Sequence, residues 1–137
     1  MSQIERVIIF LLRFSAIIMG FALITVFMPS AWMEETHKWL GLGDFPKGPI
    51  TYYLARSLSA FYVIYGGLLW LTSFNIKQYY NIIAYLAYTG LALGPTLLFI
   101  DISANMPYYW TFGEGPLIFV FSIILIILLK KIRKSDS

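Results

Sequence analysis

The stretch from Thr51 to Phe74, TYYLARSLSAFYVIYGGLLWLTSF, decides the structural class of this protein. A helix of about 20 residues spans the hydrocarbon core of a bilayer, and this stretch is long and apolar enough to do so. One arginine, Arg56, interrupts it near its start. Because charge is costly in hydrocarbon, such residues usually face the interior of a bundle or a wet cavity. The stretch therefore predicts a membrane-spanning helix with one unusual face.

Helical spacing defines that face. The residues that recur at intervals of three and four are Tyr52, Arg56, Ser59, Val63 and Gly67. Residues with this spacing lie on one side of an α-helix. We expect this side to face the inside of the protein.

The composition extends the same interpretation to the whole chain. Of its 137 residues, 59% are hydrophobic and 12% are charged, whereas soluble domains are about 25% charged. Apolar spans are predicted at about 7–28, 51–74, 80–100 and 116–132. The predicted fold is an all-α, four-transmembrane-helix bundle that forms a single domain over residues 1–137.

Several classes of chemistry are excluded or weakly supported. The chain has no cysteine, which excludes disulfides and thiolate metal sites, and its one histidine, His37, cannot form a multi-histidine site. We therefore expect no metal and no cofactor. There is no phosphate-binding loop and little to serve as a general base, so an enzyme is the least supported class. Four of the ten basic residues fall in the last eight positions, which indicates membrane topology and not nucleic-acid binding.

The basic residues also predict orientation. Those that flank the spans on one side are Arg6, Lys77, Lys130, Lys131, Arg133 and Lys134. Basic residues are enriched on the cytoplasmic side of membrane proteins. We expect a multi-pass protein of the plasma (inner) membrane with both termini in the cytoplasm. The two longer connections should then face outward.

Both long connections are rich in aromatic residues. Between Pro29 and Pro49, the pattern predicts a short amphipathic helix in the membrane interface, with Ser30 as N-cap and a stop at Gly41. A plain loop is the alternative. Trp32 and Trp39 in this connection, and Trp110 in the segment 103–115, are predicted interfacial anchors.

The third span contains a motif for close packing. Gly90 and Gly94 form GxxxG, which lets helix backbones approach closely in lipid. Pro95 follows and should kink the helix, and Asp101 is expected to close it.

The two long connections share a possible internal repeat. MPSAW at 28–32 matches MPYYW at 106–110, and KGPI at 47–50 resembles EGPL at 114–117. A duplication would make the protein two helical hairpins related by a parallel repeat. Chance, or shared interfacial chemistry, is the alternative.

The candidate site lies where charged and hydroxyl side chains collect near the outer end. Its predicted members are Arg56, Asp101, Glu114, His37, Tyr52, Tyr53 and Ser59. Arg56 needs an acceptor if it is buried, so we predict that it pairs with Asp101, or alternatively with Glu114. The cluster either locks helices together or forms the polar floor of a pocket for an anionic or hydroxylated head group.

The arginine early in the first span (LLRFSAIIMG, 11–20) and the GG pair in the second (ARSLSAFYVIYGGLLW, 55–70) complete a pattern of four short spans. This pattern resembles the small four-helix bacterial membrane proteins grouped with the DoxX-like families. The resemblance implies an association with redox or quinone-linked membrane complexes.

Two functions follow as hypotheses. The first is an accessory or scaffold component that packs in a larger inner-membrane complex or a homo-oligomer. The alternative is a binder of an apolar small molecule, such as a lipid or quinone, in an outer-leaflet pocket floored by Arg56. In both, the lipid bilayer is a partner.

Overall fold

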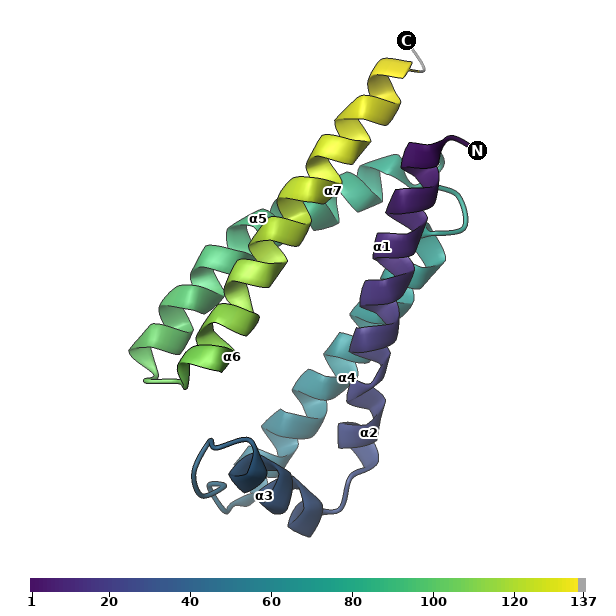
Figure 1. Cartoon of the computed structure of the whole chain (residues 1–137). Helices are drawn as coiled ribbons and strands as arrows, with labels where there is room; N and C mark the ends of the chain where they lie inside the picture. Colours follow the sequence, from purple (N-terminus) through teal and green to yellow (C-terminus); the bar gives the residue numbers. More distant parts are fainter. Residues whose placement is uncertain (136–137) are drawn as a thin grey trace. The chain divides into compact units, whose positions relative to one another are not determined.

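The computed structural model describes residues 1–135, and the regular secondary structure over that range is all α-helical (Figure 1). The helices are α1 (Gln3–Gly20), α2 (Ala22–Phe27), α3 (Ser30–Trp39), α4 (Pro49–Thr72), α5 (Tyr80–Ser103), α6 (Tyr108–Gly113) and α7 (Gly115–Ser135). The predicted all-α class is confirmed. So is the short helix between the first and second spans, which is α3.

Four segments are long and apolar enough to cross a membrane. They are Gln3–Phe27, Pro49–Thr72, Tyr80–Ser103 and Tyr108–Lys134. Each overlaps one of the predicted spans, with ends that differ by at most eight residues. The chain is therefore a multi-pass membrane protein.

The helices divide into two compact units. The first unit, Leu11–Leu71, contains most of α1 together with α2, α3 and α4. The second unit contains residues 1–10 and the chain from Thr72 onward, with α5, α6 and α7. Each unit is thus built around a helical hairpin. That the whole chain is one domain stays a prediction.

The first helix begins four residues before the predicted span because a capping box starts it. The Ser2 hydroxyl accepts a hydrogen bond from the Glu5 amide at 3.2 Å. The Glu5 carboxylate in turn accepts one from the Ser2 nitrogen at 2.6 Å. This reciprocal pair satisfies amide groups that the first turn of a helix leaves without partners.

In the first unit, α4 packs against α1 through a glycine. A Cβ placed on Gly66 would lie 3.0 Å from the carbonyl oxygen of Ala16 and 3.0 Å from Cβ of Met19. The neighbouring Gly67 meets no atom within 4 Å. Gly67, which belongs to the predicted inner face, is therefore not the glycine that contacts α1. Of two adjacent glycines, the sequence does not show which one a partner helix approaches.

The second unit is held by the GxxxG motif of α5. A Cβ on Gly94 would lie 2.7 Å from Cβ of Phe119 and 2.8 Å from the carbonyl oxygen of Gly115, while one on Gly90 would overlap the Ser122 hydroxyl. The predicted close approach is confirmed, and α7 is the helix that approaches (Figure 1). The helix continues through Pro95.

The end of α5 corrects a prediction. Asp101 does not close this helix, which continues to Ser103. Asn105 adopts the left-handed conformation, with φ of 53°. The Asn105 amide donates to the carbonyl of Ile102, and the Met106 amide donates to that of Asp101. This is a Schellman motif with asparagine in the usual glycine position, so the stop signal was Asn105.

The connection between the third and fourth spans contains a helix that we did not predict. The aromatic residues around Trp110 form this helix, which is α6. Its N-cap, Pro107, has φ −57° and ψ 144°, which are the same angles as those of Pro29 before α3. The two Met-Pro-x-x-Trp segments therefore build the same helix entry. The chain reverses after each by a Gly-Pro pair, at Pro49 and Pro116.

Replacing Gly94 with alanine should destabilise the α5–α7 pair by about 1–3 kcal/mol, the usual cost of overpacking. A methyl group there has no space because its neighbours include a backbone oxygen. Thermal unfolding in detergent measures the effect. Gly67→Ala is the matched control, since that site is open and should tolerate a methyl group. Equal melting temperatures for the two variants would contradict the packing.

Candidate functional site

Residues 30–48, here called the cap, follow α2 and precede α4. Its helix α3 begins after Pro29, which is extended, so Pro29 and not the predicted Ser30 occupies the N-cap position. Ser30 makes no side-chain capping bond. The predicted stop is confirmed, because Gly41 has φ of 71° and its amide donates to the carbonyl of Lys38. The Leu42 amide donates to the carbonyl of His37, and this bond completes a Schellman motif.

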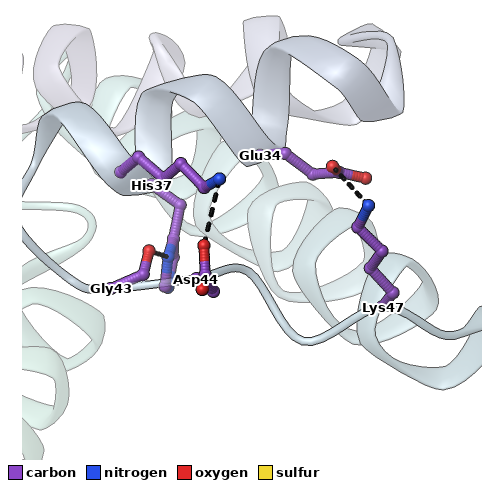
Figure 2. Close-up of polar contacts among 6 residues, drawn as sticks. Glu34, His37, Gly43, Asp44 and Lys47 are labelled. Atoms are coloured by element: carbon purple, nitrogen blue, oxygen red, sulfur yellow. Dashed lines mark hydrogen bonds and ion pairs between the residues drawn. The ribbon is translucent and has the colours of Figure 1, made fainter.

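Glu34 fixes the cap to the first turn of α4. Its carboxylate accepts a hydrogen bond of 2.6 Å from the Tyr52 hydroxyl. It also forms an ion pair of 3.5 Å with Lys47 (Figure 2). The hydrogen bond from Tyr52, and then the positive charge of Lys47, hold the pKa of Glu34 below its ordinary value. The ionised form is therefore the one that binds the cap to α4.

The loop of the cap folds back on α3. Lys38 pairs with Asp44 at 3.0 Å, and His37 Nδ1 lies 3.0 Å from the carbonyl oxygen of Gly43 (Figure 2). The hydrogen bond between Lys38 and Asp44 lowers the pKa of Asp44 and raises that of Lys38. The Phe45 ring packs edge-on against the His37 ring. Its centroid also lies 5.3 Å from that of the Tyr52 ring. His37 is thus part of the cap's structure.

Arg56 lies one turn beyond Tyr52 and reaches back to the end of α2. Its guanidinium donates a 3.2 Å hydrogen bond to the carbonyl oxygen of Met28. This carbonyl belongs to the last turn before Pro29, where the helix provides no amide partner. Within the first unit Arg56 is exposed and not buried. An arginine has five N–H donors, so one bond to a carbonyl leaves most of them available.

Arg56 lines a cleft of about 500 Å³. The residues that line it are Ser30, Pro49, Tyr52, Tyr53, Arg56 and Ser57. The lining therefore offers a fixed positive charge and four hydroxyl groups, and no carboxylate. Such a set suits the oxygen atoms of an anionic or hydroxylated group.

A second cleft, of about 360 Å³, lies on α3 itself. It is lined by Met28, Trp32, Glu35, Thr36 and Trp39. Trp32 and Trp39, two of the predicted anchors, are 62% and 82% exposed. The third, Trp110, lies in the second unit and donates a 2.9 Å hydrogen bond from its indole nitrogen to the Glu114 carboxylate.

The predicted site residues are only partly brought together. Tyr52, Tyr53 and Arg56 line one cleft, and Ser59 is on the following turn of α4, partly buried. Asp101 and Glu114 belong to the second unit. The predicted pairing of Arg56 with either carboxylate stays a prediction.

Asp101 is unusual in its own unit. Its residue surface is 5% exposed, and among the described residues its Oδ2 atom has no hydrogen-bond partner. It also lies in the last turn of α5, where the helix dipole disfavours negative charge. Asp101 thus has a stability cost within its unit.

Sequence reasoning missed several residues of the site. Ser57 is one residue from Arg56 and four from Tyr53, so helical spacing alone would have added it. The contacts of Glu34 with Tyr52 and of Arg56 with Met28 join residues 18 and 28 positions apart. No periodic pattern predicts such contacts. Over residues 1–135, no group of three His, Cys, Asp or Glu side chains is placed to hold a metal ion.

Comparisons with protein-family models, curated proteins and solved structures found no match, so no family is identified and the DoxX-like resemblance stays a prediction.

Replacing Asp101 with leucine should raise the stability of the protein. The change removes a buried carboxyl oxygen without a partner, and such a group costs about 1–3 kcal/mol. Thermal unfolding in detergent gives the result, with Asp101→Asn, which keeps a polar group there, as the comparison. A lower melting temperature for Asp101→Leu would contradict this cost and would indicate a partner outside the second unit.

Acid should loosen the cap from α4. Because the pKa of Glu34 is depressed in the folded protein, its stabilising effect is present above the ordinary glutamate pKa. This effect is lost as the pH falls below the ordinary glutamate pKa and through the lower folded one. Amide NMR of residues 40–48 between pH 6 and pH 3 should show increasing motion. Glu34→Gln should be mobile already at pH 6, with Asp44→Asn as control for the second ion pair. A rigid cap in Glu34→Gln would contradict the assignment.

Proposed function

We propose that this protein binds an amphiphile, a lipid or a quinone, with an anionic or hydroxylated head group in the Arg56 cleft. The observation that supports this proposal is the lining of the cleft. Arg56, Tyr53 and Ser57 supply a charge and hydroxyls. Glu34, which contacts Tyr52 of this lining, is already paired with Tyr52 and Lys47. A negative or acceptor group therefore meets donors there without a competing carboxylate.

The position of the cleft favours a membrane ligand over a soluble one. The cleft lies at the first turns of α4, which is a candidate membrane span. The α4 residues Ile50, Leu54 and Leu58 are exposed large apolar side chains. An amphiphile can place its apolar part along this helix while its head group contacts Arg56.

The cap gives the site rigidity. Glu34, Tyr52 and Phe45 fix residues 30–48 to α4, and Ser30 of the cap lines the cleft. A preformed site loses less entropy on binding than a flexible one. In this proposal the cap faces outward, as the distribution of basic residues predicts, and the ligand comes from the outer leaflet.

The accessory or scaffold role, which is the first of the two hypotheses from the sequence, is the second candidate here. It requires helix faces that accept another protein, but lipid accounts equally well for the exposed apolar side chains of α1 and α2. No contact at a particular site supports the accessory role. The experiment below distinguishes the two functions.

Arg56→Leu should weaken ligand retention and leave membrane insertion intact. Native mass spectrometry of protein extracted in a maltoside detergent measures bound small molecules. Titration of delipidated protein with phosphatidylglycerol or with a quinone gives relative affinities. We expect about tenfold weaker binding in the variant, since charge-assisted hydrogen bonds are lost. Arg6→Leu, which removes the same charge at an exposed position of the second unit, should bind normally.

Equal adduct levels in wild type and Arg56→Leu would overturn the proposal. Co-extraction of stoichiometric larger subunits, without a small-molecule adduct, would favour the accessory function instead.

A further inference from the structure

We infer that the second cleft, on α3, binds the positively charged ammonium group of a lipid head group between Trp32, Glu35 and Trp39. This site is separate from the Arg56 cleft, and its lining prefers the opposite charge. The inference goes beyond the proposed function and does not depend on it.

The first observation is the arrangement of the side chains. Glu35 lies three residues after Trp32 and four before Trp39, so all three share one side of α3. They line a single cleft of about 360 Å³ together with Met28 and Thr36. The carboxylate is thus flanked by two indole rings along the helix.

The second observation is that these indole rings are not used for packing. The side chain that α3 buries is Met33, which is 5% exposed. Trp32 and Trp39 are 62% and 82% exposed. Two large aromatic surfaces are therefore available to a ligand, and the two Trp residues can be replaced without opening the core.

The third observation concerns charge. Glu34 is paired with Lys47, and Lys38 with Asp44. In the described part of the cap, Glu35 is the one charged side chain without an ion pair or hydrogen bond. Its negative charge is therefore available to a cation from outside the chain.

These features together define the class of ligand. Tryptophan faces attract cations through the ring quadrupole, and aromatic sites of this kind recognise quaternary ammonium groups. A carboxylate adds a full opposite charge, and the Met28 side chain adds an apolar contact for methyl or methylene groups. Exposed tryptophans on a short helix beside membrane spans lie at head-group depth. The ammonium of a membrane lipid is therefore the ligand to which we commit.

The test uses the full chain in maltoside micelles, with ¹⁵N-labelled tryptophan. The chain has four tryptophans, so Trp70 and Trp110 serve as internal references for Trp32 and Trp39. Titration with tetramethylammonium chloride should shift the indole signals of Trp32 and Trp39 in a saturable way. Sodium chloride at equal ionic strength should not. No saturable shift, or the same shift with sodium, would overturn the inference.

Variants identify the groups responsible. Glu35→Gln and Trp39→Leu should each weaken tetramethylammonium binding by about two- to fivefold or more, the range expected for an exposed cation–π contact. Trp39→Phe, which keeps an aromatic ring, should retain part of the affinity. Ser57→Ala, which removes a hydroxyl from the Arg56 cleft and not from this one, should leave the titration unchanged, which separates this result from that of the proposed function. Unaltered binding in Glu35→Gln would overturn the inference.

The lipid source is tested in nanodiscs. Phosphatidylcholine or phosphatidylethanolamine should move the Trp32 and Trp39 signals toward their tetramethylammonium-saturated positions, relative to nanodiscs of phosphatidylglycerol alone. Identical signals in all three lipids would overturn the assignment of a lipid ammonium as the ligand.

Discussion

Close approach of helix backbones at glycine is the constraint on which the two units depend. In lipid, burying an apolar side chain against another helix gains little over leaving it against acyl chains, so helix pairs rely on tight packing. Gly66 lets α4 approach Ala16 of α1, and Gly94 lets α5 approach Gly115 of α7. Each contact involves a backbone oxygen as neighbour, so the space cannot be recovered by a side-chain rotation. The remaining features of each unit are positioned by its glycine contact.

Most of the charged side chains of the cap are paired within the first unit. Glu34, Lys38, Asp44 and Lys47 are all used within residues 30–48 or on the first turn of α4. Arg56 and Glu35 keep capacity for a ligand, and they line different clefts. The first unit thus offers donors on one surface, mostly from α4, and an acceptor with aromatic rings on another, from α3. This separation is the physical basis of both proposed sites.

Much of the architecture was predictable because membrane spans and caps are local signals. The four apolar runs, the helix at 30–39, its stop at Gly41 and the close packing at Gly90 and Gly94 were all correct. Errors occurred where two local signals competed: Pro29 took the N-cap from Ser30, and Asn105 ended α5 in place of Asp101. The S-x-x-E capping box at Ser2 was a readable signal that was overlooked.

The sequence by itself determined the class of the protein and its spans, because hydrophobicity, helix caps and glycine spacing act over a few residues. Only the tertiary structure decided which glycine of the pair at 66 and 67 meets α1, and that Arg56 binds the Met28 carbonyl. It also decided that the Glu34 carboxylate is occupied by a hydrogen bond from the Tyr52 hydroxyl. These contacts join residues 18 to 50 positions apart, and they depend on how the helices rotate against one another, which no local pattern specifies.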